Sequence, residues 1–223
     1  MQEAEQFAHI AAELSAESDQ IETLSSICDF AVQTIDCSYA GIHVVRNREI
    51  ETGAATDPLI ERADKLQTMV GEGPCLDAIW QQDTFLVEDA AHDPRWQKFG
   101  PLAAELGLHS ILSVRLFTDQ ETLGALNLYA TDVREFSAHD IATAHVLAQH
   151  ASIAFASARK ESELRRARDM RHLIGQAQGI LMERFDLSEE QAFRALRGFT
   201  DHSRRLTDVA EQLVTTRNAA PLD

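Results

Sequence analysis

Residues 137–174 constrain the fold more than any other part of the chain, because they contain neither glycine nor proline. Apolar side chains recur there at alternating spacings of three and four residues, which is the heptad pattern of a seam between helices. These side chains are Ile141, Ala144, Ala148, Ala151, Phe155 and Ala158. The charged segment KESELRRARDM follows with no helix breaker. The pattern predicts one long helical connector between residues 1–160 and residues 161–223, with a seam that can hold two copies together.

The residues before this helix predict an antiparallel sheet with helices around it. Two helices are expected in residues 2–36, the first on an apolar stripe of Phe7, Ile10, Ala11 and Leu14. The segments AGIHVVR and REIETGAA predict a hairpin with its turn at residues 46–48, and TFLVE, SILSVRLFT and TLGALNLYA predict three more strands.

Proline and glycine mark the helices that lie between these strands. One helix is expected after Asp57–Pro58 and another at Pro74, where proline suits a first turn. A further helical stretch after Asp93–Pro94 is expected to be interrupted at Gly100–Pro101. Strands and helices together predict an α+β fold for residues 1–160.

Residues 161–223 predict three short helices around a shared apolar core. Leu173, Ala177 and Leu181 lie on the first helix, and Phe193 and Phe199 fall on the apolar stripe of the second, so both aromatic rings are expected in the core. Ser188 with Gln191 has the form of a capping box at the start of the second helix. The third helix is expected to be capped by one of two residues, Asp201 or Ser203.

Charge is distributed unevenly along the chain. The whole chain has a net charge of -16, which opposes binding of a polyanion over the full surface. Residues 161–223, however, hold 10 basic and 11 acidic side chains, and every basic one is arginine. Arginine pairs with phosphate and stacks on bases, which favours contact with nucleic acid. The alternative is a solvated helical surface on which arginines such as Arg194 and Arg197 pair with Glu189 and Glu190.

Several classes of protein are not favoured. No apolar run is long enough to span a membrane, and the acidic N-terminus does not resemble a secretion signal. Three scattered cysteines form no CxxC pair, so we expect neither disulfides nor a zinc site, and a reducing cytoplasm fits best. The phosphate-binding glycine motifs and the GxSxG nucleophile motif are absent, and HxxxH or HExxH spacing is lacking among His92, His109, His139, His145, His150, His172 and His202.

Three segments resemble the GAF domain family over about residues 19–158. They are Gly71–Ala78, Asp93–Trp96 and Leu123–Tyr129. The resemblance implies an antiparallel sheet with helices packed on it, and it specifies neither a ligand nor a cofactor. Candidate pocket residues are Cys75, Trp80, Phe85, Trp96 and His109.

Cys75 allows two interpretations. A thiol near a helix start can act as a redox sensor or a cofactor attachment point, whereas a buried thiol in helix packing is the more common case. Free methionine sulfoxide reductases also use a GAF fold with several cysteines. Because Cys28 and Cys37 lie on the expected second helix and just past its end, away from the loops, reductase activity is not expected.

Residues 165–217 resemble the ANTAR output domain in three consecutive blocks. The blocks are residues 171–184, 187–197 and 204–210. The resemblance implies binding of paired RNA hairpins in leader transcripts, which prevents formation of a terminator. Candidate RNA-binding residues are Arg171, Gln176, Gln178, Arg184, Arg197, Arg204 and Arg205. Gln178 stands where the family pattern has lysine, which removes one cation and implies weaker binding with a flatter salt dependence.

The expected function is therefore that of a non-enzymatic antitermination regulator, in which a sensor domain gated by a small molecule or protein controls RNA binding by a homodimer without a membrane partner. Two modules would turn the second hairpin contact into an intramolecular event. The main alternative is a signalling module that binds another protein and no nucleic acid. An enzyme that uses Cys75 and a DNA-binding protein are further alternatives, and the acidic chain disfavours the last.

Overall fold

The computed structural model describes residues 20–46, 49–81, 83–200 and 205–219. The chain divides into two compact units, Met1–Arg159 and Lys160–Asp223, and helix α6 (Ala138–Phe185) contributes to both. Among the described residues, no helix is long and apolar enough to cross a membrane. The expected stripe at Phe7–Leu14, the residues 47–48 of the hairpin turn, the caps Asp201 and Ser203, and Arg204 lie outside the described residues.

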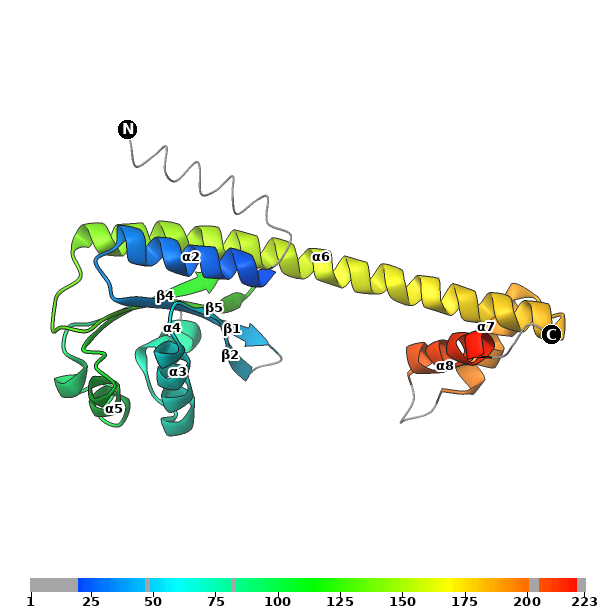
Figure 1. The fold of residues 1–223 in the computed structure, drawn as a ribbon, viewed down its shortest axis with the longest axis horizontal. Coiled ribbons are helices and arrows are strands. Elements are labelled where there is room, and N and C mark those ends of the chain that lie inside the picture. The colour runs from blue at the N-terminus through cyan, green and yellow to red at the C-terminus, as the bar shows by residue number, and fades with distance from the viewer. Residues whose placement is uncertain (1–19, 47–48, 82, 201–204, 220–223) are drawn as a thin grey trace, which may run out of the picture. The chain divides into compact units, whose positions relative to one another are not determined.

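The first unit is built on a five-stranded sheet with the order β2-β1-β5-β4-β3, in which every neighbouring pair is antiparallel. Its strands are β1 (Tyr39–Arg46), β2 (Glu49–Ala55), β3 (Thr84–Val87), β4 (Ser110–Phe117) and β5 (Thr122–Ala130). Helix α2 (Gln20–Thr34) and the first part of α6 cover one face, and α3 (Pro58–Val70), α4 (Pro74–Gln81) and α5 (Phe99–Glu105) lie on the other, as Figure 1 shows. The predicted α+β class, the hairpin and the five strands are confirmed.

Side-chain alternation assigns each strand residue to one of these two faces. Ala40, Ile42 and Val44 of β1 pack with α2 and α6 in the larger core, so Gly41 and His43 point to the face that carries α3 and α4. Strand β5 is buried at every residue after Thr122, because helices cover both of its faces. The sequence of a strand that is covered on both faces is a nearly continuous apolar run.

A side-chain cap, prolines and a glycine explain the ends of α3 and the start of α5, two helices on the face of the sheet opposite α2 and α6. The side chain of Asp57 accepts a hydrogen bond from the backbone of Leu59, and Pro58 occupies the first turn of α3. Gly71 ends α3 in the left-handed conformation, with φ of 71°. The predicted interruption at Gly100–Pro101 is wrong, because α5 runs through both residues. Pro101 lies in the first turn of α5, where a missing N–H breaks no helical hydrogen bond.

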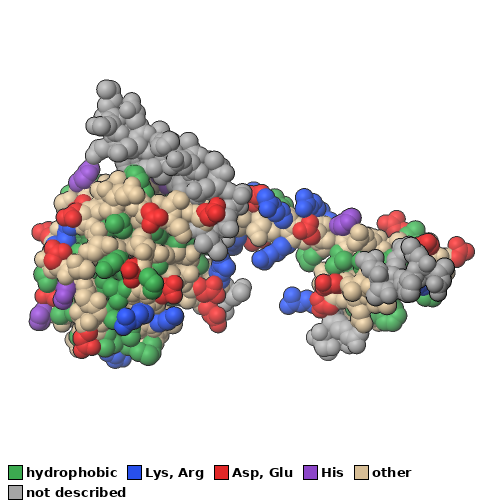
Figure 2. Space-filling model, in the orientation of Figure 1, with side chains coloured by type: hydrophobic (Ala, Val, Ile, Leu, Met, Phe, Trp, Pro, Cys, Tyr) green, Lys and Arg blue, Asp and Glu red, His purple; other side chains and the backbone are tan. Residues whose placement is uncertain are grey.

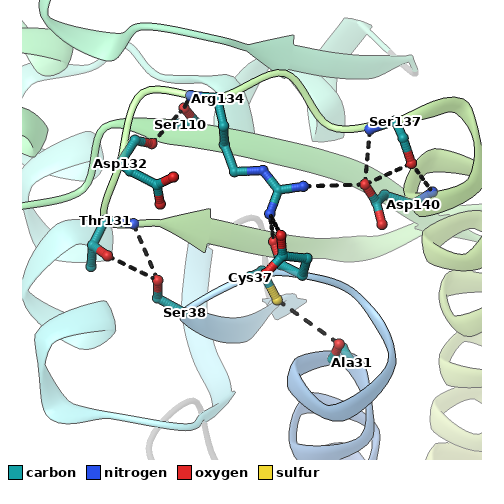
Figure 3. Close-up of polar contacts among 10 residues, drawn as sticks. Ala31, Cys37, Ser38, Ser110, Thr131, Asp132, Arg134, Ser137 and Asp140 are labelled. Carbon is teal, nitrogen blue, oxygen red and sulfur yellow. Dashed lines mark hydrogen bonds and ion pairs between the residues drawn. The ribbon is translucent and has the colours of Figure 1, made fainter.

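The start of α6 is fastened to the loop after α2 by Arg134 (Figure 3). The Arg134 guanidinium lies 2.6 Å from the carboxylate of Asp36 and 3.3 Å from that of Asp140. Asp140 also accepts hydrogen bonds from the backbone and the hydroxyl of Ser137, each at 2.8 Å. The Ser137 hydroxyl in turn accepts from the backbone N–H of Asp140 at 3.1 Å, so Ser137 caps α6, which begins at Ala138, next to the start that the sequence predicted.

The heptad seam is filled within the chain itself. Ala144, Ala148, Ala151 and Phe155 are buried in the larger core with α2 and the sheet. A spacing of three and four residues shows that a helix has an apolar face, but it does not identify the partner. Dimerisation through this seam is therefore not what the structure shows for these four residues.

The second unit packs the end of α6 against α7 (Glu189–Gly198) and α8 (Leu206–Ala219). Its buried core consists of Ala177, Leu181, Ala192, Leu196, Val209 and Ala210. The first of the three expected helices is not a separate short helix but the end of α6. The capping box of Ser188 and Gln191 is confirmed.

The two phenylalanines of the second helix depart from their prediction. Phe199 is 62% exposed and Phe193 is 37% exposed, so neither belongs to the core. Ala192 and Leu196 fill the inward positions of α7 instead. The apolar face predicted from the sequence, which included both rings, is wider than the buried face of the 10-residue helix α7.

Candidate functional site

Polar side chains interrupt the apolar surface of the sheet beneath α3 and α4. His43 lies between Ile42 and Val44 on β1, and Asn127 lies between Leu126 and Leu128 on β5. Asn127 is paired across the sheet with Ser113 of β4. All three polar residues are buried. Polar groups in such positions are kept only when they have partners or a function.

His43 is the centre of a buried polar cluster, which we define as His43, Asp64, Cys75 and Asn127. Nε2 of His43 lies 2.5 Å from a carboxylate oxygen of Asp64 on α3. Nδ1 of His43 lies 2.6 Å from the sulfur of Cys75 on α4 and 2.6 Å from the side-chain nitrogen of Asn127. The hydroxyl of Thr52 donates to the same Asp64 oxygen at 2.7 Å. Side chains from two helices and one neighbouring strand thus contact the imidazole, and Thr52 of β2 contacts it only through Asp64.

The electrostatics of the cluster favour a charged imidazole. Burial by itself lowers the pKa of His43, but negative charge on Cys75 and Asp64, with hydrogen bonds to both, raises it to about 10. Burial raises the pKa of Tyr129 well above its usual range, and the charges of Asp64 and Cys75 raise it further. The cluster therefore holds its charges by pairing them rather than by solvation.

Three buried polar atoms around this cluster have no hydrogen-bond partner among the described residues. They are Gln67 Nε2, Ser113 Oγ and Asn127 Oδ1. Tyr129 and Asp64 form no hydrogen bond of standard geometry, but their side chains interact closely enough to raise the pKa of Tyr129. Leaving a buried polar atom unpaired costs about 1–3 kcal/mol, so three of them in one region indicate a place where a small polar molecule or a chemical change is accommodated.

The loop between α3 and α4 forms a wall of this region. A carboxylate oxygen of Glu72 accepts hydrogen bonds from the backbone of Lys98 and of Phe99, which ties the loop to the start of α5. Gly73 has φ of 153°, and a Cβ there would lie 2.1 Å from Oε1 of Gln67. Only glycine lets the backbone approach Gln67 this closely.

The five predicted pocket residues lie in different surroundings. Cys75 belongs to the buried polar cluster, and Phe85 and Trp96 pack edge to face with ring centroids 5.8 Å apart. Trp96 is buried and donates from Nε1 to Asp77 at 2.7 Å. Trp80, however, is 58% exposed. His109 is half-buried, and its backbone bonds to Ala90 and Ala130.

Sequence reasoning missed most of the cluster. His43, Asp64 and Gln67 were not candidates, and Asn127 and Tyr129 entered only as letters of a family motif. A signal was present, since a polar residue between two large apolar residues in a doubly buried strand points to a specific role.

A cavity of about 540 Å³ lies in the first unit, away from this cluster. Its lining comes from β4, the turn after it and α6, and consists of Arg115, Phe117, Thr118, Asp119, His145, Ala148, Gln149, Ser152 and Ile153. None of the five predicted pocket residues lines it. Among the described residues, no group of three or more His, Cys, Asp or Glu side chains could hold a metal ion.

Basic side chains lie at the surface of the second unit (Figure 2), and several of its arginines are exposed without an ion pair. Arg171, Arg184, Arg197 and Arg205 have no carboxylate within salt-bridge distance among the residues that the structure describes. The same holds for Arg194, so the expected pairing of Arg194 and Arg197 with Glu189 and Glu190 is not what the structure shows. These guanidinium groups are therefore available to an anionic partner.

The two glutamines predicted for RNA binding differ in their surroundings. Gln176 is exposed on α6. Gln178 is half-buried, and its side-chain nitrogen donates weakly to the backbone oxygen of Glu189 at 3.4 Å. Gln178 therefore faces the start of α7, near the capping box.

Comparison with known proteins places both units in described families. The GAF domain model matches residues 17–156, and the ANTAR domain model matches residues 162–214, so both families expected from the motifs are confirmed. No match was found among curated proteins.

Solved structures show the fold of the GAF region at low identity. The GAF domain of a phosphoenolpyruvate-protein phosphotransferase from Coxiella burnetii is 18% identical, with a TM-score of 0.57 over 70% of this chain and 94% of that chain. A free methionine-R-sulfoxide reductase from Neisseria meningitidis, in complex with its substrate, is 19% identical, with a TM-score of 0.55 over 70% of this chain and 89% of that chain. The chain belongs to the GAF domain family, and its GAF domain is followed by an ANTAR domain.

Proposed function

We propose that this protein is an RNA-binding transcription antitermination regulator, in which the GAF domain senses a signal and controls binding of paired leader-transcript hairpins by the ANTAR domain. The observation that carries the proposal is the set of exposed, unpaired arginines on the three-helix unit that the ANTAR model matches. Arginine outside an ion pair is available for phosphate and for unstacked bases of an RNA loop.

The contrast within α6 supports this interpretation. Arg165 and Arg168, which precede the packed part of the second unit, pair with Glu161 and Asp169. Arg171 and Arg184 on the same helix have no such partner among the described residues. Arg166 is also exposed without a carboxylate partner among the described residues, so the charge available to an RNA backbone begins at Arg166 and continues onto the part of α6 that packs with α7 and α8.

A dimer could hold two hairpins at once. Helix α6 has an exposed apolar face, distinct from the heptad seam, along which two copies could pair. Val146 and Ile153 are exposed, by 38% and 59%, and their spacing of 7 residues places them on one side of the part of α6 that belongs to the first unit. This face is separate from the filled heptad seam. We propose that two copies meet along it.

The test is binding of the full chain to a leader RNA with two hairpins, compared with one hairpin and with duplex DNA, over a range of salt concentrations. Arg171→Gln should weaken binding and lower the slope of log affinity against log salt by about one. Arg165→Gln is the matched control, because Arg165 is paired with Glu161, and it should leave that slope unchanged. Equal affinity for one and two hairpins by a stable monomer would contradict the proposal.

A protein partner in place of RNA is the second candidate, and exposed apolar side chains of the ANTAR unit favour it. Phe185 and Phe199 are each at least 60% exposed. Because large exposed apolar groups mark interaction surfaces, a protein could dock there. Absence of RNA binding at every salt concentration, in the presence and absence of a signal, would favour this second candidate.

A further inference from the structure

The three cysteines of the chain sit in different surroundings. Burial raises the pKa of the Cys28 thiol far above its usual range, and burial raises that of Cys37 to about 12 although Arg134 lowers it. Neither thiol contacts a histidine among the described residues. Cys75 differs because its sulfur lies 2.6 Å from Nδ1 of His43. One cysteine in the chain therefore has a base in contact with its sulfur.

We propose that Cys75 is a modification site for hydrogen peroxide, with His43 as the base that accepts the thiol proton and Asp64 as the group that positions His43. The geometry is that of an activated nucleophile, in which a base contacts the nucleophile and a third group orients the base. All three side chains are buried, so their relative positions are fixed by packing.

The hydrogen bonds define which nitrogen of His43 acts as the base. Asp64 accepts at Nε2, so the imidazole proton belongs there in the neutral form. The side-chain amide of Asn127 also lies 2.6 Å from Nδ1, and because its oxygen and nitrogen exchange places on rotation of the amide, this contact does not assign the proton of Nδ1. With the neutral-form proton on Nε2, Nδ1 is the nitrogen that takes the Cys75 proton, and the raised pKa of His43 favours the resulting pair of imidazolium and thiolate.

The reaction is balanced with hydrogen peroxide as the oxidant. The Cys75 proton moves to Nδ1 of His43, and the sulfur attacks one peroxide oxygen as the O–O bond breaks. The leaving hydroxide takes the proton from His43 and departs as water. The sulfur loses two electrons to the peroxide and becomes a sulfenic acid, which is the first step of the thiol oxidation ladder.

The unpaired polar atoms around Cys75 are an independent observation that points to the same site. Oε1 of Gln67 accepts from the backbone N–H of Cys75 at 3.1 Å, so the unpaired Nε2 of Gln67 belongs to an amide held beside this cysteine. Gln67 is 1% exposed, and Asn127, whose Oδ1 is unpaired, is fully buried. These groups can bind peroxide before the reaction and the new hydroxyl after it.

Oxidation of Cys75 would change the contacts that hold α4 to the sheet. Cys75 lies at the start of α4, and its sulfur joins that helix to His43 on β1. An added oxygen would displace this 2.6 Å contact. That this change alters RNA binding rests on the proposed function, whereas the oxidation itself does not.

The test is site-resolved oxidation of the reduced, full-length protein. Hydrogen peroxide is added together with dimedone, which traps sulfenic acid, and labelling at each cysteine is followed by mass spectrometry. We expect labelling of Cys75 to be roughly 100-fold faster than labelling of Cys28 or Cys37. Labelling of Cys75 at or below the rate of the other two, or no labelling of any cysteine, would overturn the proposal.

Variants test the roles of His43 and Asp64. His43→Gln and Asp64→Asn should each slow labelling of Cys75 by about tenfold or more, whereas Cys28→Ser should leave it unchanged. Far-UV circular dichroism shows whether each variant folds, and the wild-type comparison among the three cysteines depends on none of them. A folded His43→Gln that labels at the wild-type rate would remove His43 as the base.

RNA binding separates this proposal from the proposed function. Peroxide should change the affinity of the wild type for two-hairpin RNA at least several-fold and leave Cys75→Ser unaffected. Labelling of Cys75 with unchanged RNA affinity would overturn its role as a signal. Labelling of Cys75 in a chain that binds no RNA would reject the proposed function and keep the modification site.

Discussion

Three polar residues, His43, Ser113 and Asn127, give the buried interior of the GAF domain its polar chemistry. Each stands in a strand where apolar residues flank it, and each is buried. The sequence therefore contained the signal for their special role. The contacts of His43 with Asp64 and Cys75 were not predictable, because these two residues reach the cluster from two helices whose packing depends on the whole fold.

Two buried serines allow a matched test of the unpaired hydroxyl. The Ser113 hydroxyl has no partner, whereas that of Ser152 accepts from the backbone of Phe117 and donates to the backbone oxygen of Ala148. Ser113→Ala should raise the free energy of unfolding by about 1 kcal/mol, and Ser152→Ala should lower it by about the same amount. Urea unfolding measures both. Destabilisation by Ser113→Ala would show that a bound water satisfies that hydroxyl.

Cys37 predicts a loss of stability at alkaline pH. Burial raises the pKa of its thiol from 9.0 to about 12 in the folded protein, so between these values the unfolded chain loses a proton that the folded chain keeps. The free energy of unfolding should therefore fall as pH rises from 9 to 12, by at most about 1.4 kcal/mol per pH unit from this group. Thermal unfolding should show a shallower decline in Cys37→Ser, and identical declines would refute the assignment.

At the scale of secondary structure, the sequence predicted most elements because their signals are local. Asp57–Pro58, Pro74 and the Ser188 capping box are side-chain and backbone features that act within a few residues. Apart from the interruption predicted at Gly100–Pro101, the wrong predictions concern the partners of a helix face rather than the helix itself. The heptad seam packs on the chain's own sheet, whereas Phe193 and Phe199 are exposed. Both predictions failed because periodicity shows that a helix has an apolar face without showing what covers that face.

Two glycines within α6 carry a prediction about this element. A Cβ at Gly175 or Gly179 would meet nothing within 4 Å, so no packing in the chain requires glycine there. Gly175→Ala and Gly179→Ala should each stabilise the helix by about 0.5–1 kcal/mol, because glycine is a poor helix former. If RNA approaches this backbone closely, the same substitutions should weaken RNA binding. A rise in Tm with unchanged RNA affinity would exclude a close approach at these positions.

At the scale of the whole molecule, two families and their order were predictable from motifs, whereas the assembly was not. Sequence showed that α6 would be long, but only burial showed which of its faces stays exposed. Val146→Glu and Ile153→Glu place charge on the exposed face and should convert a dimer to a monomer, as measured by sedimentation equilibrium. Met69→Glu is the control, because Met69 is a highly exposed apolar residue on α3. Monomeric wild type, or dimeric Ile153→Glu, would contradict assembly along this face.

The unpaired atoms around His43 have a consequence for any attempt to engineer this protein. Each unpaired atom lowers the stability of the folded state, so a laboratory selection for heat resistance alone would favour apolar replacements around the imidazole. Such a selection would not detect whether the selected proteins still respond to a signal. A stabilised descendant could keep the same sheet, helices and arginines and yet respond to nothing. Heat resistance and responsiveness should therefore be selected together in this chain.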